Sequence, residues 1–193
     1  VFDEVITGFG RMGTAFATQK FNVKPDIITM AKALTNGAIP MGGVAVTDEI
    51  YNTVTNAAPE DAIEFFHGYT YSAHPAACAA GIATQKIYES EGLFERAAAL
   101  EEYFLDAVWS LQDHPLVADI RGIGLMAGVE LVSDGVAGRR GGQMQKAMFW
   151  NGLHVKFTGD NAIIAPAFIA ERKHVDEIVD KFRTSLDAAL DAK

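Results

Sequence analysis

Lys32 is the only ionisable residue in a long apolar stretch of the sequence, because no other charged side chain lies between Asp26 and Asp48. An ammonium group in such a stretch either reaches solvent or lies in a pocket where loss of water favours the neutral amine. A neutral lysine amine is a nucleophile that forms Schiff bases with carbonyl compounds, including the cofactor pyridoxal phosphate (PLP). The sequence therefore leaves two interpretations open, a surface lysine after a strand and a Schiff-base lysine.

Asp3 is a second candidate for chemistry, because strand alternation over residues 1–6 would place it among valines. In that pattern Val1, Asp3 and Val5 share one face of the strand. A buried carboxylate needs a hydrogen-bond donor or a cation, and it can keep a pyridinium nitrogen protonated. An aspartate at an exposed strand edge fits the same pattern, so both interpretations stay open here.

The glycines from Gly8 to Gly13 match G-x-G-x-x-G, the spacing of a dinucleotide-binding turn. The helix expected after them, over residues 14–20, is short. Asp26 comes before the next strand, whereas the ribose-binding acid of that motif follows it. We therefore favour glycines that let the chain leave the strand in a tight turn, and we keep a nucleotide-binding oxidoreductase module as an alternative.

Histidine, tyrosine and small polar residues are concentrated between His67 and Pro75. Pro75 suits the first turn of a helix, and Gly92 suits its end. Small residues along this helix predict very close packing, and they are Ala76, Ala77, Ala79, Ala80, Gly81 and Ala83. His74 and Cys78 stand four residues apart, but two ligands without a third do not predict a metal site, so no metal is expected.

The elements that must position these residues form two groups. Strands are expected over residues 1–6, 27–30 and 44–46, which places Lys32 at the carboxyl end of the second strand, where ligands gather in open parallel sheets. A helix is expected over residues 48–56. Later strand patterns occupy residues 117–132, 153–158 and 162–168, and later helical patterns occupy residues 93–112, 143–151 and 170–190, with a polar loop over 133–142. We therefore expect an α/β fold, with residues 1–92 in a large domain and residues 93–193 in a small α+β domain.

The composition limits the classes of partner. Sixteen basic and 25 acidic residues give a formal charge of −9, which repels nucleic-acid backbones and anionic membranes, so neither partner is expected. The single cysteine, Cys78, cannot form an internal disulfide, and this suits a cytoplasmic location. The sequence begins within a strand pattern at Val1 without an initiator methionine, so we expect it to be the back part of a longer chain.

Four motifs stand in order along the chain: Val-Phe-Asp-Glu-Val at residues 1–5, Thr-Gly-Phe-Gly-Arg at residues 7–11, Pro-Asp at 25–26 with Ala-Lys at 31–32, and residues 67–75. Together they resemble the class III aminotransferases of PLP fold type I, and the resemblance covers nearly the whole chain. Residues 35–42 and the histidine-to-proline motif most resemble the transaminases that act on omega-amino acids or β-alanine with pyruvate. The fold implied is part of the large, mostly parallel-sheet domain plus the small carboxyl-terminal domain.

The resemblance implies a role for each matching residue. Lys32 would bind PLP covalently and carry the proton between substrate and cofactor. Asp3 would pair with the pyridinium nitrogen, and Val5 would pack on the ring face. Thr70, with Tyr69 beside it, would donate to the cofactor phosphate of the neighbouring subunit, which implies a homodimer or a dimer of dimers.

The sequence also departs from the family pattern. The family's phosphate-binding glycine-serine loop and ring-stacking aromatic residue would lie before Val1, in an amino-terminal half absent from this sequence. Lys156 stands where the family often has an arginine, four residues before Asp160, and would meet a substrate carboxylate as a point charge. The expected function is transfer of an amino group from an omega-amino acid or amine to pyruvate or another keto acid. An aminomutase or a decarboxylase on the same fold, and a non-catalytic fragment that serves assembly, are the alternatives.

Overall fold

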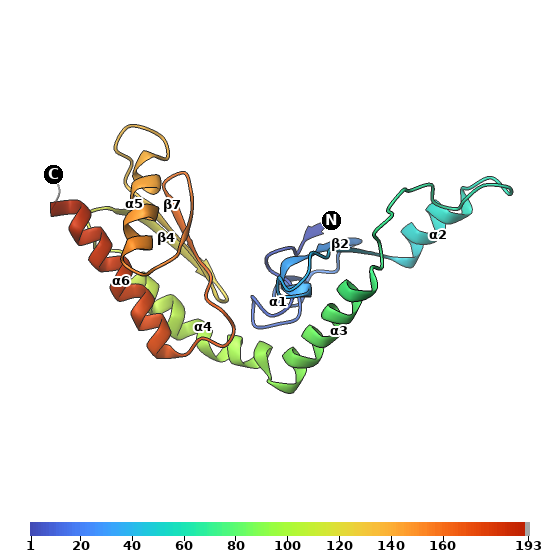
Figure 1. Cartoon of the computed structure of the whole chain (residues 1–193), viewed down its shortest axis with the longest axis horizontal. Helices are drawn as coiled ribbons and strands as arrows, with labels where there is room; N and C mark the ends of the chain where they lie inside the picture. The colour runs from blue at the N-terminus through green and yellow to red at the C-terminus, as the bar shows by residue number, and fades with distance from the viewer. Residues whose placement is uncertain (192–193) are drawn as a thin grey trace. The chain divides into compact units, whose positions relative to one another are not determined.

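The computed structural model describes residues 1–191, which divide into two compact units (Figure 1). Unit 1 covers Val1–Phe94, and unit 2 begins at Glu95. The boundary predicted after residue 92 falls close to this division. Over residues 1–191, no helix is both long enough and apolar enough to cross a lipid bilayer.

Unit 1 contains a three-stranded sheet with the order β1-β2-β3. β1 (Phe2–Asp3) runs parallel to β2 (Ile27–Met30), and β3 (Gly43–Val46) pairs with the other edge of β2 in the antiparallel direction. The prediction of β2 is confirmed, and β3 begins one residue earlier than predicted. The strand predicted over residues 1–6 is wrong in length, because β1 ends at Asp3.

Glu4 explains why β1 is short. Its side chain is only 1% exposed, and its carboxylate accepts hydrogen bonds from the amides of Ala17 (3.1 Å) and Thr18 (2.9 Å) and from the Thr7 hydroxyl. These bonds draw the chain out of the strand. The amide of Gly8 then donates to the carbonyl of Glu4 at 2.9 Å, and an added Cβ at Gly8 would lie 2.8 Å from that oxygen. The buried carboxylate of this segment is therefore Glu4, whereas Asp3 is exposed.

The glycine segment from Gly8 to Gly13 forms turns that close over Glu4. Phe9, Gly10 and Gly13 all have positive φ angles, of 60°, 105° and 73°. The helix that follows, α1 (Ala17–Lys20), has four residues and begins three residues later than predicted. A single helical turn that is already capped by Glu4 does not support the dinucleotide-binding interpretation.

Two longer helices complete unit 1, and both begin where the sequence predicts. α2 (Asp48–Asn56) has Asp48 and Glu49 in its first turn, where carboxylates stabilise the positive end of the helix dipole. α3 (Pro75–Ser90) begins after His74, whose Nδ1 accepts a hydrogen bond from the amide of Ala76 at 3.2 Å. It ends just before Gly92, which has a φ angle of 57°. His74 is thus a helix cap.

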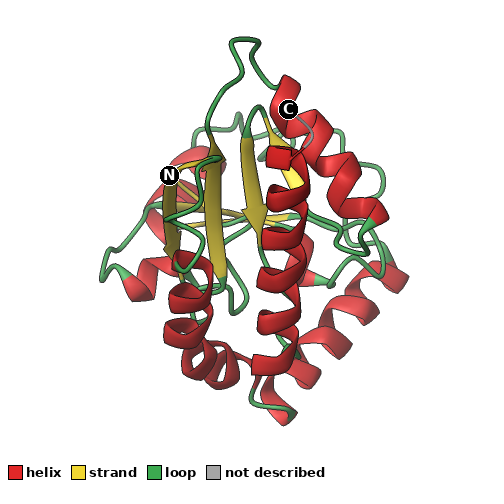
Figure 2. Cartoon of the chain, turned by 90° about the vertical axis from the view of Figure 1, so that its left-hand side faces the viewer, coloured by secondary structure: helices red, strands yellow, loops and turns green. Residues whose placement is uncertain are grey.

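Unit 2 is built on a four-stranded antiparallel sheet with the order β4-β5-β7-β6. Its strands are β4 (Val117–Ile123), β5 (Met126–Leu131), β6 (Lys156–Thr158) and β7 (Asn161–Ile164). The helices α4 (Leu93–Trp109), α5 (Arg139–Trp150) and α6 (Arg172–Asp191) cover one face of it (Figures 1 and 2). Between them lie the largest buried side chains of the unit: Phe104, Leu111, Leu125, Met144, Met148, Phe182 and Leu186.

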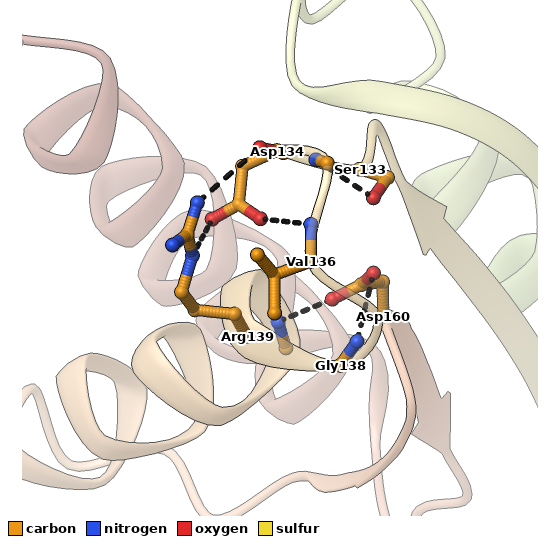
Figure 3. A network of polar contacts seen from close by, with 8 residues as sticks. Ser133, Asp134, Val136, Gly138, Arg139 and Asp160 are labelled. Atoms are coloured by element: carbon orange, nitrogen blue, oxygen red, sulfur yellow. Dashed lines mark hydrogen bonds and ion pairs between the residues drawn. The ribbon is translucent and has the colours of Figure 1, made fainter.

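Asp160 sets the start of α5, which begins inside the loop predicted over residues 133–142. Its carboxylate accepts hydrogen bonds from the amides of Gly138 (3.2 Å) and Gly141 (2.8 Å). Figure 3 shows Asp160 beside Gly138 at the start of the helix. The loop before α5 is held by a separate ion pair, in which Arg139 Nε lies 2.8 Å from Asp134. The two strands predicted around Asp160 are shorter than predicted, since β6 begins at Lys156 and β7 ends at Ile164.

Candidate active site

Lys32 follows β2 and opens the short 3₁₀ helix η1 (Lys32–Leu34), at the carboxyl end of the strand as predicted. Its φ angle of 41° lies in the left-handed region, which is strained for a residue with a side chain. Such strain is concentrated at functional sites. The Lys32 side chain is exposed, so the residues of this chain do not form the apolar pocket expected around it.

Helix α3 supports the turn that carries Lys32. The Tyr88 hydroxyl donates to the carbonyl of Ala33 at 2.7 Å, and Gln85 Nε2 donates to the carbonyl of Leu34 at 3.3 Å. The buried Thr35 closes the turn through a hydrogen bond from its hydroxyl to the carbonyl of Ile39 at 2.6 Å. The backbone around Lys32 is therefore fixed by side chains from a different element.

Arg11 adds a positive charge beside Tyr88. Burial lowers the pKa of the Arg11 guanidinium and raises the pKa of the Tyr88 phenol, and the charge of Arg11 partly opposes the second shift. The phenol keeps its proton at neutral pH, as an ordinary tyrosine does. Tyr88 is thus held as a hydrogen-bond donor toward Ala33.

Asp3 lies on β1, which pairs with β2, the strand that precedes Lys32. Asp3 is in register with Thr29 of β2. Its Oδ1 accepts hydrogen bonds from the amide of Val5 at 3.0 Å and from the hydroxyl of Thr29 at 3.2 Å. Within residues 1–191, Oδ2 receives no hydrogen bond and is left for a cation or donor from outside. Val5 lies in the turn after β1, so the predicted strand alternation does not relate it to Asp3. The two residues are linked by this hydrogen bond instead.

Tyr69 and Thr70 lie in an exposed segment, because every residue from 59 to 76 is exposed. The Tyr69 ring stacks on the His67 ring with their centroids 4.9 Å apart. Among the described residues, neither hydroxyl makes a hydrogen bond. No hydrogen bond of that set links Tyr69 or Thr70 to Lys32 or Asp3, so this chain does not by itself bring the predicted site residues together.

Lys156 is at the start of β6, an edge strand of unit 2, and its side chain is exposed. The predicted alternation holds around it, since Leu153 and Val155 are buried while His154 is exposed. Strand register aligns Lys156 with Ile163, Gly128 and Arg121 across the sheet, in that order. Residues paired in this way share one face, which is the face that the helices leave uncovered.

Arg121 is a second cation on that open face, and it lies in β4, within the strand pattern predicted over residues 117–132. Its Nη1 donates to Glu130 at 2.9 Å and to Asp119 at 2.8 Å, and these hydrogen bonds raise the pKa of Arg121. A hollow of about 420 Å³ lies beside it, lined by Arg121, Gly122, Ile123, Met126, Ala127, Gly128 and Ile163. Strand alternation over residues 117–123, combined with that of the next strand in the hairpin, β5, is the sequence pattern that could have placed Arg121 on this face.

Comparison with known proteins identifies the family. The family model for class III aminotransferases matches residues 1–186. An omega-aminotransferase of Caulobacter vibrioides is 48% identical over 187 residues, which cover 96% of this chain and 42% of that protein. An omega-amino acid–pyruvate aminotransferase of Pseudomonas putida is 42% identical over 193 residues, covering 99% of this chain and 43% of that protein.

Solved structures show the same fold. An (S)-enantioselective omega-transaminase from Thermomicrobium roseum superposes with a TM-score of 0.89 at 39% identity, over 97% of this chain and 43% of that one. A transaminase solved with L-alanine gives a TM-score of 0.93 at 31% identity, over 98% of this chain and 46% of that one. The chain thus spans less than half the length of these relatives. It belongs to the class III aminotransferases.

Proposed function

We propose that this chain is the carboxyl-terminal part of a PLP-dependent transaminase that moves an amino group from an omega-amino acid or amine to pyruvate or another keto acid. The observation that carries the proposal is the placement of Lys32 and Asp3 by two neighbouring parallel strands. Lys32 lies two residues after the end of β2 in a strained left-handed conformation, and Asp3 ends β1 with Oδ2 unbonded among residues 1–191. The names of the related proteins from Caulobacter and Pseudomonas support the substrate class.

The residues present fit PLP, the cofactor of this family. When bound, PLP supplies an aldehyde that reacts with amines and a protonated ring that accepts electrons from the substrate carbon. The aldehyde requires an amine, which Lys32 offers, and the ring nitrogen requires a carboxylate, which Asp3 offers. Lys32 follows Thr29, the register partner of Asp3, by three residues, or about 10 Å of extended chain.

Each of the side chains at this site would then have a separate role in the reaction. The Lys32 amine would hold the aldehyde carbon of the cofactor and would move a proton to and from the substrate carbon. The Asp3 carboxylate keeps the ring nitrogen protonated, while the Val5 amide and Thr29 hydroxyl fix its orientation. Val5 would also lie against the ring.

Thr70 and Lys156 complete the proposed assignments. Thr70, with Tyr69 next to it, lies in an exposed segment and would donate its hydroxyl to the cofactor phosphate of a neighbouring subunit, so the active enzyme would be a dimer. Lys156 would bind the carboxylate of the keto acid, because it is the exposed cation of β6. An ammonium meets a carboxylate as a point charge, without the two-pronged fork of an arginine.

Borohydride reduction of the full-length, PLP-loaded enzyme followed by peptide mapping tests the assignment. We expect one pyridoxyl group, on Lys32, because this lysine follows the carboxyl end of β2, the strand that pairs in parallel with the strand of Asp3. A pyridoxyl group on Lys20, on Lys24 or on no lysine of this chain would refute it. Pyruvate-dependent consumption of the amine separates a transaminase from an aminomutase or a decarboxylase, which need no keto-acid acceptor.

A further inference from the structure

Helix α3 contacts the Lys32 turn through two side-chain donors. Tyr88 and Gln85 are three residues apart, so they project from the same face of the helix. Tyr88 reaches the carbonyl of Ala33 at 2.7 Å, and Gln85 reaches the carbonyl of Leu34 at 3.3 Å. Both acceptors belong to η1 and directly follow Lys32 in the chain.

The bonds internal to this turn leave room for relaxation. The amide of Leu34 donates to the carbonyl of Ala31 at 2.9 Å, and the amide of Thr35 reaches the carbonyl of Lys32 at 3.3 Å, which is long for a backbone hydrogen bond. A lysine with a φ angle of 41° persists only where its surroundings over-determine it. The two donors from α3 provide that constraint from outside the turn.

Tyr88 is suited to this task because it is fixed and stays protonated. It is 5% exposed, and its ring packs against the Phe94 ring with centroids 5.3 Å apart. Burial raises the pKa of its phenol, which favours the protonated hydroxyl that donates to Ala33. The hydrogen bond to Ala33, at 2.7 Å, is the shorter of the two.

We infer that Tyr88, assisted by Gln85, is a positioning residue that holds the backbone of Lys32 in its left-handed conformation and so aims the amine. This inference rests on the proposed function of Lys32. The competing explanation is that Tyr88 only packs α3 against the rest of unit 1. The two explanations predict different places for the effect of removing the Tyr88 hydroxyl. A positioning role predicts a change at η1, and a packing role predicts a change along α3 as well.

The test compares Tyr88→Phe with the parent in the full-length protein. The matched control is Tyr103→Phe, which removes a hydroxyl that donates to Asp176 in unit 2. In the protein freed of cofactor, we expect hydrogen exchange at the amides of Leu34 and Thr35 to rise about two- to tenfold, the effect of losing one net hydrogen bond. Exchange along α3 should stay at the parent rate, and the control should change neither region.

Two further measurements report on Lys32 itself. Acylation of Lys32 by an amine-specific reagent in the cofactor-free protein should change several-fold in rate in Tyr88→Phe, with the other lysines unaffected. In the loaded enzyme kcat should fall several-fold while KM for the amine is unchanged, because Lys32 moves the proton and does not bind the rest of the substrate. Gln85→Leu should show the same effects in weaker form.

The outcomes separate this inference from the proposed function. If borohydride traps PLP on Lys32 but Tyr88→Phe matches the parent in exchange at residues 34–35 and in Lys32 acylation, the positioning role is wrong. If Tyr88→Phe raises exchange along α3 as much as at η1, Tyr88 is a packing residue and the inference also fails. If Tyr88→Phe does not fold, Gln85→Leu decides by the same measurements. Absence of any Lys32 adduct in the parent contradicts the proposed function instead.

Discussion

At the scale of single residues, two adjacent carboxylates have opposite environments. Glu4 is buried, and its carboxylate accepts hydrogen bonds from three donors of the same chain. Asp3 is exposed, and its Oδ2 accepts no hydrogen bond among the described residues. A carboxylate with a free oxygen can serve a ligand, and one whose oxygens are already occupied holds the fold. We therefore propose Asp3, and not Glu4, as the carboxylate of this segment that serves a ligand.

Asp3→Asn tests that conclusion, because asparagine keeps the shape and the acceptor for Val5 and Thr29 while removing the charge. We expect the full-length enzyme to retain PLP and to lose turnover by orders of magnitude, since an unprotonated ring cannot accept the electrons of the substrate carbon. The measurements are kcat and the bound cofactor per subunit. Asp26→Asn, at another exposed carboxylate of unit 1, is the control, and near-normal turnover of Asp3→Asn would remove Asp3 from the mechanism.

Lys156 gives a second prediction at this scale. If it binds the carboxylate of the keto acid, Lys156→Ala should weaken kcat/KM for pyruvate about tenfold or more, from the loss of ~1.5 to 3 kcal/mol for a hydrogen bond to a charged group. The value of kcat/KM for aldehydes without a carboxylate should not change. Lys156→Arg should keep the parent kcat/KM for pyruvate. Equal losses for both acceptors, or none for either, would place carboxylate binding elsewhere.

At the scale of elements, two buried helical glycines differ in the space around them. Gly81 lies in α3, where an added Cβ would meet Met41 Sδ at 3.5 Å and the carbonyl oxygen of Leu34 at 3.8 Å, both ordinary contacts. Gly141 lies in α5, where an added Cβ would be 2.0 Å from the carbonyl oxygen of Gly159. The predicted very close packing of α3 therefore does not require glycine at position 81, whereas the start of α5 requires it at 141.

The pair Gly81→Ala and Gly141→Ala turns this difference into a stability measurement. Gly81→Ala should raise the free energy of unfolding by about 0.5 to 1 kcal/mol, because alanine loses less backbone entropy in a helix. Gly141→Ala should lower it by about 3 kcal/mol, because a backbone carbonyl has to move. Denaturant unfolding of the full-length protein gives both values, and similar effects of the two substitutions would contradict this account.

The elements that the sequence predicts well are those with local signals. β2 and α2 match their predicted bounds because an apolar run and a first turn rich in carboxylates mark them within a few residues. The predicted start of α5 and the predicted end of β1 were wrong, because residues far away in the sequence determine both positions. Asp160 caps a helix about twenty residues earlier, and Glu4 binds amides thirteen and fourteen residues later, and no local pattern records such bonds.

The candidate site divides in the same way. Lys32 could be predicted from its charge in an apolar run, but its left-handed backbone and its support by Tyr88 could not, because the contact spans 55 residues of sequence. The contact between Arg121 and Glu130 could not be predicted, because it depends on the pairing of β4 with β5. Exposed positions such as Tyr69 and Thr70 carry no packing signal, so their roles come from family resemblance alone.

At the scale of the whole molecule, the exposed segment 59–76 is the feature that this chain does not explain by itself. It contains large apolar side chains that are strongly exposed, among them Phe66 at 91% and Tyr71 at 84%. Side chains of this kind are commonly covered in an assembly. The proposed dimer, with Thr70 serving the other subunit, is the arrangement to test.

Mixing two inactive variants of the full-length enzyme, Lys32→Ala and Thr70→Ala, provides the test. A mixed dimer has one site that lacks both residues and one intact site, so activity should return to about a quarter of the parent level after random exchange between two subunits. Native mass spectrometry verifies the exchange. No recovery after verified exchange would show that Thr70 acts within its own chain or has no role in the reaction.

The double hydrogen bond from Gly138 and Gly141 to Asp160 has a consequence for how the protein tolerates change (Figure 3). This carboxylate fixes the start of α5, and the exposed residues Gly135 to Ala137 form the surface turn that the Asp134–Arg139 ion pair closes. Extra residues inserted there would lengthen a surface turn and leave the β6–β7 hairpin with Lys156 in place. That turn is therefore where a fluorescent label, an affinity tag or natural length variation can enter the small unit without reaching its chemistry.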